Sequence, residues 1–219
     1  MEPNARTLVQ CDFDGTVTDK DVSFLLLDAF ADGDWRKLLR QYQAGEITVG
    51  QFNTTAFALI RQGKETLLNY LKGRIRVRGG FPELVAYCRR RGLRFVIVSN
   101  GQDFYIEKIL SDLGLGDVEF FCARSRFEPQ GIRVQYIGPD GLPVDSDFKE
   151  TYVNLFLSQG YRIIYIGNGA SDFAPAQRCH HIFATGDLLA YCQRQNLPCT
   201  PFTNFNEVIR GLAGNFVAV

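Results

Sequence analysis

The sequence lacks the features that mark a zinc-binding, secreted or membrane protein. Its six cysteines form no C-x-x-C pair, and its two histidines, His180 and His181, have no third metal ligand near them. We therefore expect no zinc site and free thiols, as is usual in a reducing compartment. No run approaches the roughly 18 apolar residues of a membrane span, and the opening MEPNARTLV has no apolar signal-like segment. These absences predict a cytoplasmic protein without a signal peptide or a membrane anchor.

The sequence also lacks an excess of either charge. Lys plus Arg and Asp plus Glu number 24 each, so no overall field would attract nucleic acid or an anionic membrane. Arginines cluster in RIRVRGG and CRRRG, but no aromatic residues are interleaved with them. We interpret these clusters as a solvated face and expect a small-molecule partner, not nucleic acid or a membrane.

Short apolar runs alternate with amphipathic segments along most of the chain. The apolar runs predict buried strands at residues 7–13, 93–100, 161–168 and 181–185. The amphipathic segments predict helices at residues 82–92, 103–114, 148–160 and 187–196. This alternation predicts an α/β fold, with a Rossmann-like parallel sheet flanked by helices and right-handed crossovers.

Two regions depart from the alternation. Residues 18–75 show only helical patterns and predict a small helical cap inserted after the first strand. Residues 118–147 predict a β-hairpin, with turns at PQG and PDG. The expected organisation is a core domain of residues 1–17 and 76–219 and a cap domain of residues 18–75.

Two aspartates, Asp12 and Asp14, follow the first predicted strand in LVQCDFDGT. Sites in parallel sheets form beyond the carboxyl ends of the strands, so Asp12 should project into such a crevice. Because like charges repel, acids crowded there usually need a cation or a reaction to explain them. A carboxylate can attack phosphorus to give an aspartyl-phosphate, and Mg²⁺ favours oxygen ligands and bridges to phosphate. Gly15 allows a sharp exit of the chain, and Thr16 adds a hydroxyl beside the carboxylates.

The run DFDGTVTD resembles the first motif, D-x-D-x-T, of the haloacid dehalogenase-type phosphatases. The other motifs of that family occur in the same order: Ser99 ends the FVIVSNG strand, Lys149 opens a helix, and IGNGASD is similar to G-D-G-x-x-D. Four motifs at compatible spacing are far more specific than one, and the resemblance covers nearly the whole chain. The sequence is most similar to the phosphoserine phosphatase-like branch, close to phosphatases of methionine salvage.

The resemblance implies a role for each matched residue. Asp12 would be the nucleophile, Asp14 the general acid and then base, and Lys149 would neutralise charge between nucleophile and phosphate. The residues implied in substrate binding are Thr16, Asp21, Ser99, Asn100 and Gly101. The implied Mg²⁺ ligands are Asp12, Asp14 through its backbone carbonyl, Asn168, and Asp172 through the water shell of the metal. The predicted activity is hydrolysis of a small-metabolite phosphate monoester through an aspartyl-phosphate on Asp12.

One position departs from the family pattern. Asn168 stands where these phosphatases usually carry the first acid of the fourth motif. Asparagine offers a carbonyl oxygen but no negative charge, so metal affinity should fall. The alternative function is therefore a catalytically weakened protein that binds, and senses, a phosphorylated ligand. A dinucleotide site at GNGASD is disfavoured because Asp172 occupies the position where that motif needs a small residue.

The predicted cap is rich in aromatic residues. Most of them should form its core, and one or two should line an apolar pocket: Phe24, Phe30, Trp35, Phe52 and Phe57. The arginine that phosphoserine phosphatases use for the substrate carboxylate has no clear counterpart, since Ala56 stands there. A substrate with an apolar tail therefore fits better than an amino acid phosphate. The same aromatic surface is a candidate homodimer interface, and the sequence does not identify the substrate.

Overall fold

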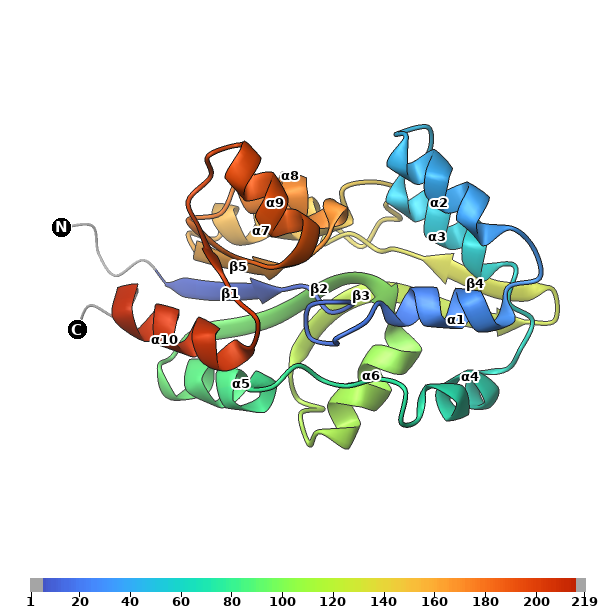
Figure 1. The fold of residues 1–219 in the computed structure, drawn as a ribbon, viewed down its shortest axis with the longest axis horizontal. Coiled ribbons are helices and arrows are strands. Elements are labelled where there is room, and N and C mark those ends of the chain that lie inside the picture. The colour runs from blue at the N-terminus through green and yellow to red at the C-terminus, as the bar shows by residue number, and fades with distance from the viewer. Residues whose placement is uncertain (1–5, 216–219) are drawn as a thin grey trace.

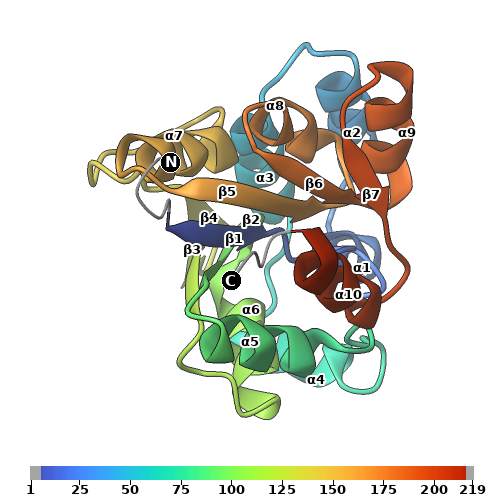
Figure 2. The same cartoon turned by 90° about the vertical axis from the view of Figure 1, so that its left-hand side faces the viewer.

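Seven strands form the central sheet of the structure, a computed structural model that describes residues 6–215 (Figures 1 and 2). They lie in the order β4-β3-β2-β1-β5-β6-β7. Their bounds are β1 Thr7–Cys11, β2 Arg94–Gln102, β3 Glu119–Glu128, β4 Gly131–Gln135, β5 Arg162–Gly167, β6 His181–Ala184 and β7 Cys199–Pro201. Neighbouring strands are parallel except β3 and β4, which form an antiparallel hairpin at one edge.

Strand β1 lies in the middle of the sheet because its side chains suit burial on both faces. Leu8, Val9 and Cys11 are fully buried, and β1 pairs with β2 on one side and β5 on the other. Figure 2 shows α7, α8 and α9 over one face and α5, α6 and α10 over the other. These helices are α5 Phe81–Arg90, α6 Asp103–Asp112, α7 Phe148–Ser158, α8 Phe173–Gln177, α9 Gly186–Arg194 and α10 Phe205–Asn215.

Four helices between β1 and α5 form the cap. They are α1 Val22–Phe30, α2 Trp35–Gln43, α3 Val49–Phe57 and α4 Lys64–Leu71. The two connections to the core pair with each other, since the Asp19 amide donates to the Arg76 carbonyl and the Arg78 amide to the Val17 carbonyl, at 2.9 and 2.8 Å. Helix α3 packs on β4, so the β3–β4 hairpin reaches from the sheet to the cap (Figure 1). This paired stem joins the cap to the core.

The predicted α/β fold with a helical cap after the first strand is confirmed, and the strand ends agree to within a few residues. Ser99 lies inside β2, which continues to Gln102, so the prediction that it ends the strand is wrong. Strand β7 and helix α10 were not predicted. Two glycines weaken the helical pattern of α10, and Gly211 is required there because a Cβ would lie 2.6 Å from the Phe183 ring. None of the helices described is both long and apolar enough to cross a bilayer.

Candidate active site

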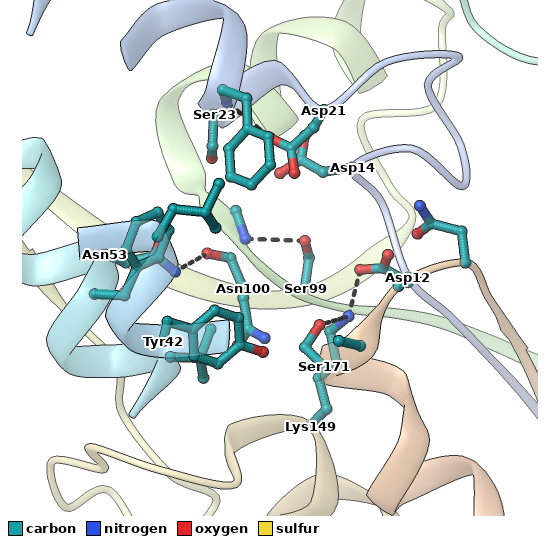
Figure 3. A pocket seen from close by; sticks show the side chains of 18 of the residues that line it. Asp12, Asp14, Asp21, Ser23, Tyr42, Asn53, Ser99, Asn100, Lys149 and Ser171 are labelled. Carbon is teal, nitrogen blue, oxygen red and sulfur yellow. Dashed lines mark hydrogen bonds and ion pairs between the residues drawn. The ribbon is translucent and has the colours of Figure 1, made fainter. Parts of the chain in front are cut away.

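A cavity of about 280 Å³ opens at the carboxyl ends of β1, β2 and β5, beneath the cap (Figure 3). Asp12 follows β1, Ser99 lies near the end of β2, Asn168 follows β5, and Lys149 begins α7. Parallel strands end at the same edge of a sheet, so residues distant in sequence converge there. Helices α1, α2 and α3 of the cap supply the opposite wall, through residues that include Phe24, Leu39, Tyr42, Val49, Phe52 and Asn53.

Lys149 joins two acids at the floor of the cavity. Its ammonium donates to Asp12 Oδ1 at 2.7 Å and to Asp172 Oδ1 at 2.6 Å, with Ser171 Oγ at 3.2 Å. Burial opposes the charged form of Lys149, but Asp12 and Asp172 outweigh it and raise its pKa above the usual range. Burial also raises the pKa of Asp12 to about 6, although Lys149 acts in the opposite direction. The pair therefore places a permanent positive charge beside a buried carboxylate.

Asp172 is fully buried and its carboxylate is saturated by protein donors. Oδ1 accepts from Lys149 and from the Tyr165 hydroxyl at 2.7 Å. Oδ2 accepts from the backbone amides of Asn168 and Gly169, both at 2.9 Å. Four donors match the acceptor capacity of a carboxylate, so Asp172 orients Lys149 and closes the loop after β5. The indirect metal role implied by the sequence stays a prediction.

Asp14 lies across the cavity from Lys149, between the core and the cap. Its Oδ1 accepts from the Val22 amide at 3.2 Å, and its Oδ2 accepts from the Tyr105 hydroxyl at 2.5 Å. Tyr105 also pairs with the Ser23 hydroxyl at 2.9 Å. Burial, and secondarily the charge of Asp21, raise the pKa of Asp14 well above its usual value. A raised pKa favours the protonated form of a carboxyl group, which is the form that a general acid needs.

Thr16 and Gly15 fix the conformation of the first motif, although neither residue lines the cavity. Thr16 is fully buried, and its hydroxyl lies 2.8 Å from Asn168 Oδ1 and 3.2 Å from Asp12 Oδ2. It therefore contacts two of the predicted metal ligands and is not among the residues that line the cavity. Gly15 has φ +73°, and a Cβ there would lie 2.4 Å from Asn168 Nδ2, so only glycine fits.

The segment from Ser99 to Gly101 lines the cavity beside Asp14. The Gly101 amide donates to Ser99 Oγ at 3.0 Å. A Cβ on Gly101 would lie 2.4 Å from Asp14 Oδ2 and 2.3 Å from the Tyr105 hydroxyl, so glycine lets this backbone approach the acid closely. A hydroxyl and backbone amides at one end of a cavity are suitable donors for an anion.

Asp21 lines the cavity from the cap side, as the residue that caps α1. Its Oδ1 accepts from the Phe24 amide at 2.8 Å. Burial raises the pKa of Asp21 to about 6, against the effects of that amide and of Lys149. Sequence reasoning did not identify Tyr105, Tyr165 or Asn53, whose partners are distant in the chain. Ser171 belongs to the fourth motif and could have been found there.

The donor set can be tested for a hard divalent cation. Asp12 Oδ2 and Asn168 Oδ1 lie on either side of the Thr16 hydroxyl, and Asp14 lies on the same loop. Carboxylate and amide oxygens suit Mg²⁺, and a nearby cation would counter the burial that raises the pKa values of Asp12 and Asp14. Within residues 6–215, no group of three His, Cys, Asp or Glu side chains is placed to hold a metal ion. The oxygen donors of these residues suit Mg²⁺. They carry less negative charge than a cluster of three acids would provide.

Comparison with known proteins agrees with the fold and the motifs. The model of the haloacid dehalogenase-like hydrolase family matches residues 9–177. Because this match covers more than half of the chain, the protein belongs to that family, and the prediction of an enzyme of its phosphatase type is confirmed.

Individual relatives make the similarity more specific. The chain is 30% identical to 2-hydroxy-3-keto-5-methylthiopentenyl-1-phosphate phosphatase of Brevibacillus brevis over 91% of this chain and 92% of that protein. It is 31% identical to the protein of the same name from Geobacillus kaustophilus, over 92% and 93%. A solved structure described as a phospho-aspartyl intermediate analogue of phosphoserine phosphatase matches with TM-score 0.71 and 17% identity, over 95% of this chain and 99% of that one. The structural match shows the shared fold.

Proposed function

We propose that the protein is a Mg²⁺-dependent phosphomonoesterase that hydrolyses a small-metabolite phosphate through an aspartyl-phosphate on Asp12. The observation that carries this proposal is the buried Lys149–Asp12 pair, 2.7 Å apart, which faces Asp14 across one small cavity. The arrangement puts a nucleophile, a fixed positive charge and a second acid whose pKa is raised by burial around the same space. We keep the division into a core domain and a cap of residues 18–75 as part of the proposal.

The proposed reaction has two steps. A carboxylate oxygen of Asp12 attacks phosphorus, the bond from phosphorus to the ester oxygen breaks, and Asp14 gives its proton to the leaving alcohol. Asp14 then takes a proton from water as that water attacks phosphorus, which releases inorganic phosphate and restores both acids. The Ser99 hydroxyl and the Asn100 amide would hold the phosphoryl oxygens, with the Gly101 amide donating to Ser99 Oγ at 3.0 Å. Lys149 offsets the negative charge that gathers beside Asp12.

Asp12, Asn168 and the backbone carbonyl of Asp14 would hold Mg²⁺. When bound, the ion would supply positive charge that lets phosphate approach carboxylates. Thr16 would keep Asp12 and Asn168 in place through its hydroxyl, 3.2 and 2.8 Å from their oxygens. Asp172 would act through Lys149 and the loop that carries Asn168, because its own oxygens are already bonded.

The cap wall supports an ester with an uncharged, partly apolar tail. Phe24, Leu39, Val49 and Phe52 present apolar surface to the cavity. Of the described residues that line it, Lys149 alone is cationic, and it is already paired with two acids. No free cation lines the described cavity to meet a substrate carboxylate. We therefore propose 2-hydroxy-3-keto-5-methylthiopentenyl-1-phosphate, the compound in the names of the curated relatives, as the substrate, in preference to phosphoserine.

Release of inorganic phosphate from that ester and from phosphoserine, with MgCl₂ and with EDTA, tests the proposal. We expect Mg²⁺-dependent turnover of the keto ester and little turnover of phosphoserine. Asp12→Asn should abolish turnover, because an amide is not a nucleophile toward phosphorus. Asp117→Asn, at an exposed aspartate paired with Arg89, is the matched control and should keep full activity. Undiminished turnover by Asp12→Asn would refute the assignment of the nucleophile.

Asn168 favours a second candidate, a phosphate-ester sensor with weakened catalysis. The proposed ligand set then has one direct carboxylate, that of Asp12, because Asp14 would contribute its backbone carbonyl and its carboxyl is bonded to Val22 and Tyr105. A titration with Mg²⁺ separates the two functions. Turnover that saturates at millimolar Mg²⁺ supports the enzyme. Binding of the ester without hydrolysis at any Mg²⁺ concentration supports the sensor.

A further inference from the structure

The carbonyl oxygen of Asn100 receives two hydrogen bonds that come from different parts of the molecule. The Tyr136 hydroxyl, just after β4, donates to it at 2.6 Å. Nδ2 of Asn53, on cap helix α3, donates to it at 3.3 Å (Figure 3). The same Nδ2 donates to the Tyr136 hydroxyl at 2.7 Å. The cap, the hairpin and the end of β2 therefore meet at one backbone carbonyl.

That carbonyl belongs to the peptide whose amide donates to Ser99 Oγ at the wall of the cavity. A trans peptide unit is planar, and its C=O and N–H point in opposite directions. Fixing the Asn100 carbonyl therefore fixes the direction of the Gly101 N–H. That N–H is 3.0 Å from Ser99 Oγ, and both residues line the cavity. The small Gly101, pressed against Asp14 and Tyr105, has no side chain to hold this peptide in place.

Asn53 and Tyr136 are polar side chains in buried positions. Asn53 is 4% exposed on a helix whose neighbours include Phe52 and Phe57, and Tyr136 is 3% exposed beside the Phe148 ring. Burying polar groups costs stability unless they are hydrogen-bonded, and here both bond to each other and to the same carbonyl. Burial raises the pKa of Tyr136, so its hydroxyl keeps the proton that it donates.

We propose that Asn53 and Tyr136 are positioning residues that hold the Asn100–Gly101 peptide against Ser99 Oγ, so that the Ser99 hydroxyl points toward the phosphoryl group, and that they couple cap docking to this orientation. The catalytic part of this inference rests on the proposed phosphatase function. It makes the hairpin, through Tyr136, a part of the machinery that binds phosphate. Without both donors, the Gly101 amide should lose its alignment with Ser99 Oγ, and the Ser99 hydroxyl its alignment with developing negative charge.

Tyr136→Phe is the main test, with Tyr152→Phe as its matched control. Tyr152 also donates one hydroxyl to a backbone carbonyl, that of Ile137, at 3.2 Å, and it too packs on Phe148. We expect Tyr136→Phe to lower kcat about tenfold, with KM changed less than about threefold, because alignment matters most in the transition state. Tyr152→Phe should change kcat less than about twofold. Equal effects of the two variants on kcat would overturn the inference.

Variants at Asn53 test whether kcat depends on the hydrogen bonds that this side chain donates and not on its size. Asn53→Asp keeps the shape but replaces Nδ2 with an acceptor that would divert the Tyr136 hydroxyl from Asn100. We expect it to lower kcat more than Asn53→Ala does, and we expect Asn53→Ala with Tyr136→Phe to lower kcat about a hundredfold. A larger loss with Asn53→Ala than with Asn53→Asp would contradict the role of the donor.

A readout without turnover separates this inference from the proposed function. Amide hydrogen exchange followed by NMR should show Gly101 exchanging about tenfold faster in Tyr136→Phe than in the wild type or Tyr152→Phe. If the wild type hydrolyses no phosphate ester but this difference appears, the proposed function fails and the positioning of the peptide stands. If the exchange rates are equal, the inference fails whatever the activity.

Discussion

The two ends of the cavity are built in different ways. At the core end, Asp12, Lys149 and Asp172 are almost completely buried, and their charged atoms bond to one another or to backbone amides. At the cap end, apolar rings make the wall: Phe52 lies 6.3 Å from the Phe24 ring in an edge-on contact and 5.9 Å from the Tyr42 ring in a stacked one. Ion pairs hold the core end together, whereas packed aromatic rings form the cap end.

We expect the core end of the cavity to determine turnover and the cap end to determine which substrate is accepted. Buried charges are stable only with well-placed partners, so the core end allows one geometry and tolerates little change. Apolar contacts are non-directional and roughly proportional to area, so the cap end can change its shape without disturbing the reacting groups. Substitutions at the core end should therefore change turnover and stability, whereas those at the cap end should change which ester is accepted.

Lys149→Met should break the core end most severely. It leaves Asp12 and Asp172 buried without their partner, which should cost about 3–5 kcal/mol of unfolding free energy. Turnover per folded molecule should fall about a thousandfold, because the charge beside the phosphoryl group is lost. Urea unfolding and phosphate release measure the two effects. Lys108→Met, which removes an exposed lysine paired with Asp112, is the control and should cost less than about 1 kcal/mol.

Asn168→Asp should strengthen Mg²⁺ binding at the core end, because it adds the negative charge that the family pattern carries at this position. A carboxylate in place of the amide should tighten Mg²⁺ binding about tenfold, since the number of charged ligands sets affinity. Calorimetric titration with MgCl₂ measures this directly. Asn69→Asp, on the exposed surface of α4, should leave Mg²⁺ affinity unchanged. Weaker binding by Asn168→Asp would mean that Asn168 does not contact the ion.

Gln43→Arg should alter selectivity at the cap end without touching the core end. Gln43 lines the cavity at the end of α2, and an arginine there would offer a partner for a substrate carboxylate. We expect kcat/KM for phosphoserine to rise about tenfold, with turnover of the keto ester within about threefold of wild type. Gln41→Arg, on the same helix but outside the cavity lining, is the control. An equal gain in both variants would point to general attraction of anions instead.

The same contrast explains what sequence alone could predict. Asp12, Asp14, Ser99, Lys149 and Asn168 follow or adjoin predicted elements, so the parallel topology was enough to bring them together. Tyr105, Asn53 and Tyr136 could not be found in this way. Their partners lie 91, 47 and 36 residues away in the chain, and no local pattern marks a side chain whose role depends on tertiary placement.

The fold was predicted to a similar extent. Strong apolar runs gave the central strands, because burial on both faces leaves a continuous signal. The edge strand β7 is three residues long and ends in Pro201, so it carries little pattern. The glycines of α10 hide a helix that tertiary packing selects. Of the cap, the sequence predicted helices and aromatic character, but not which rings face the cavity.

Asp21→Asn should give the smallest effect, at the boundary between the two ends. Burial raises the pKa of Asp21 to about 6 from its ordinary value of 3.8, so between these values the folded protein binds more protons than the unfolded chain. This acid therefore lowers stability as pH rises from about 4 to 6, and the loss persists at higher pH. Asparagine cannot ionise but can still cap α1. In EDTA, the variant should gain about 1 kcal/mol over wild type at pH 7.5 and almost nothing near pH 4 by urea unfolding. An equal gain at both pH values would show that packing, and not buried charge, governs the residue that joins the cap to the core.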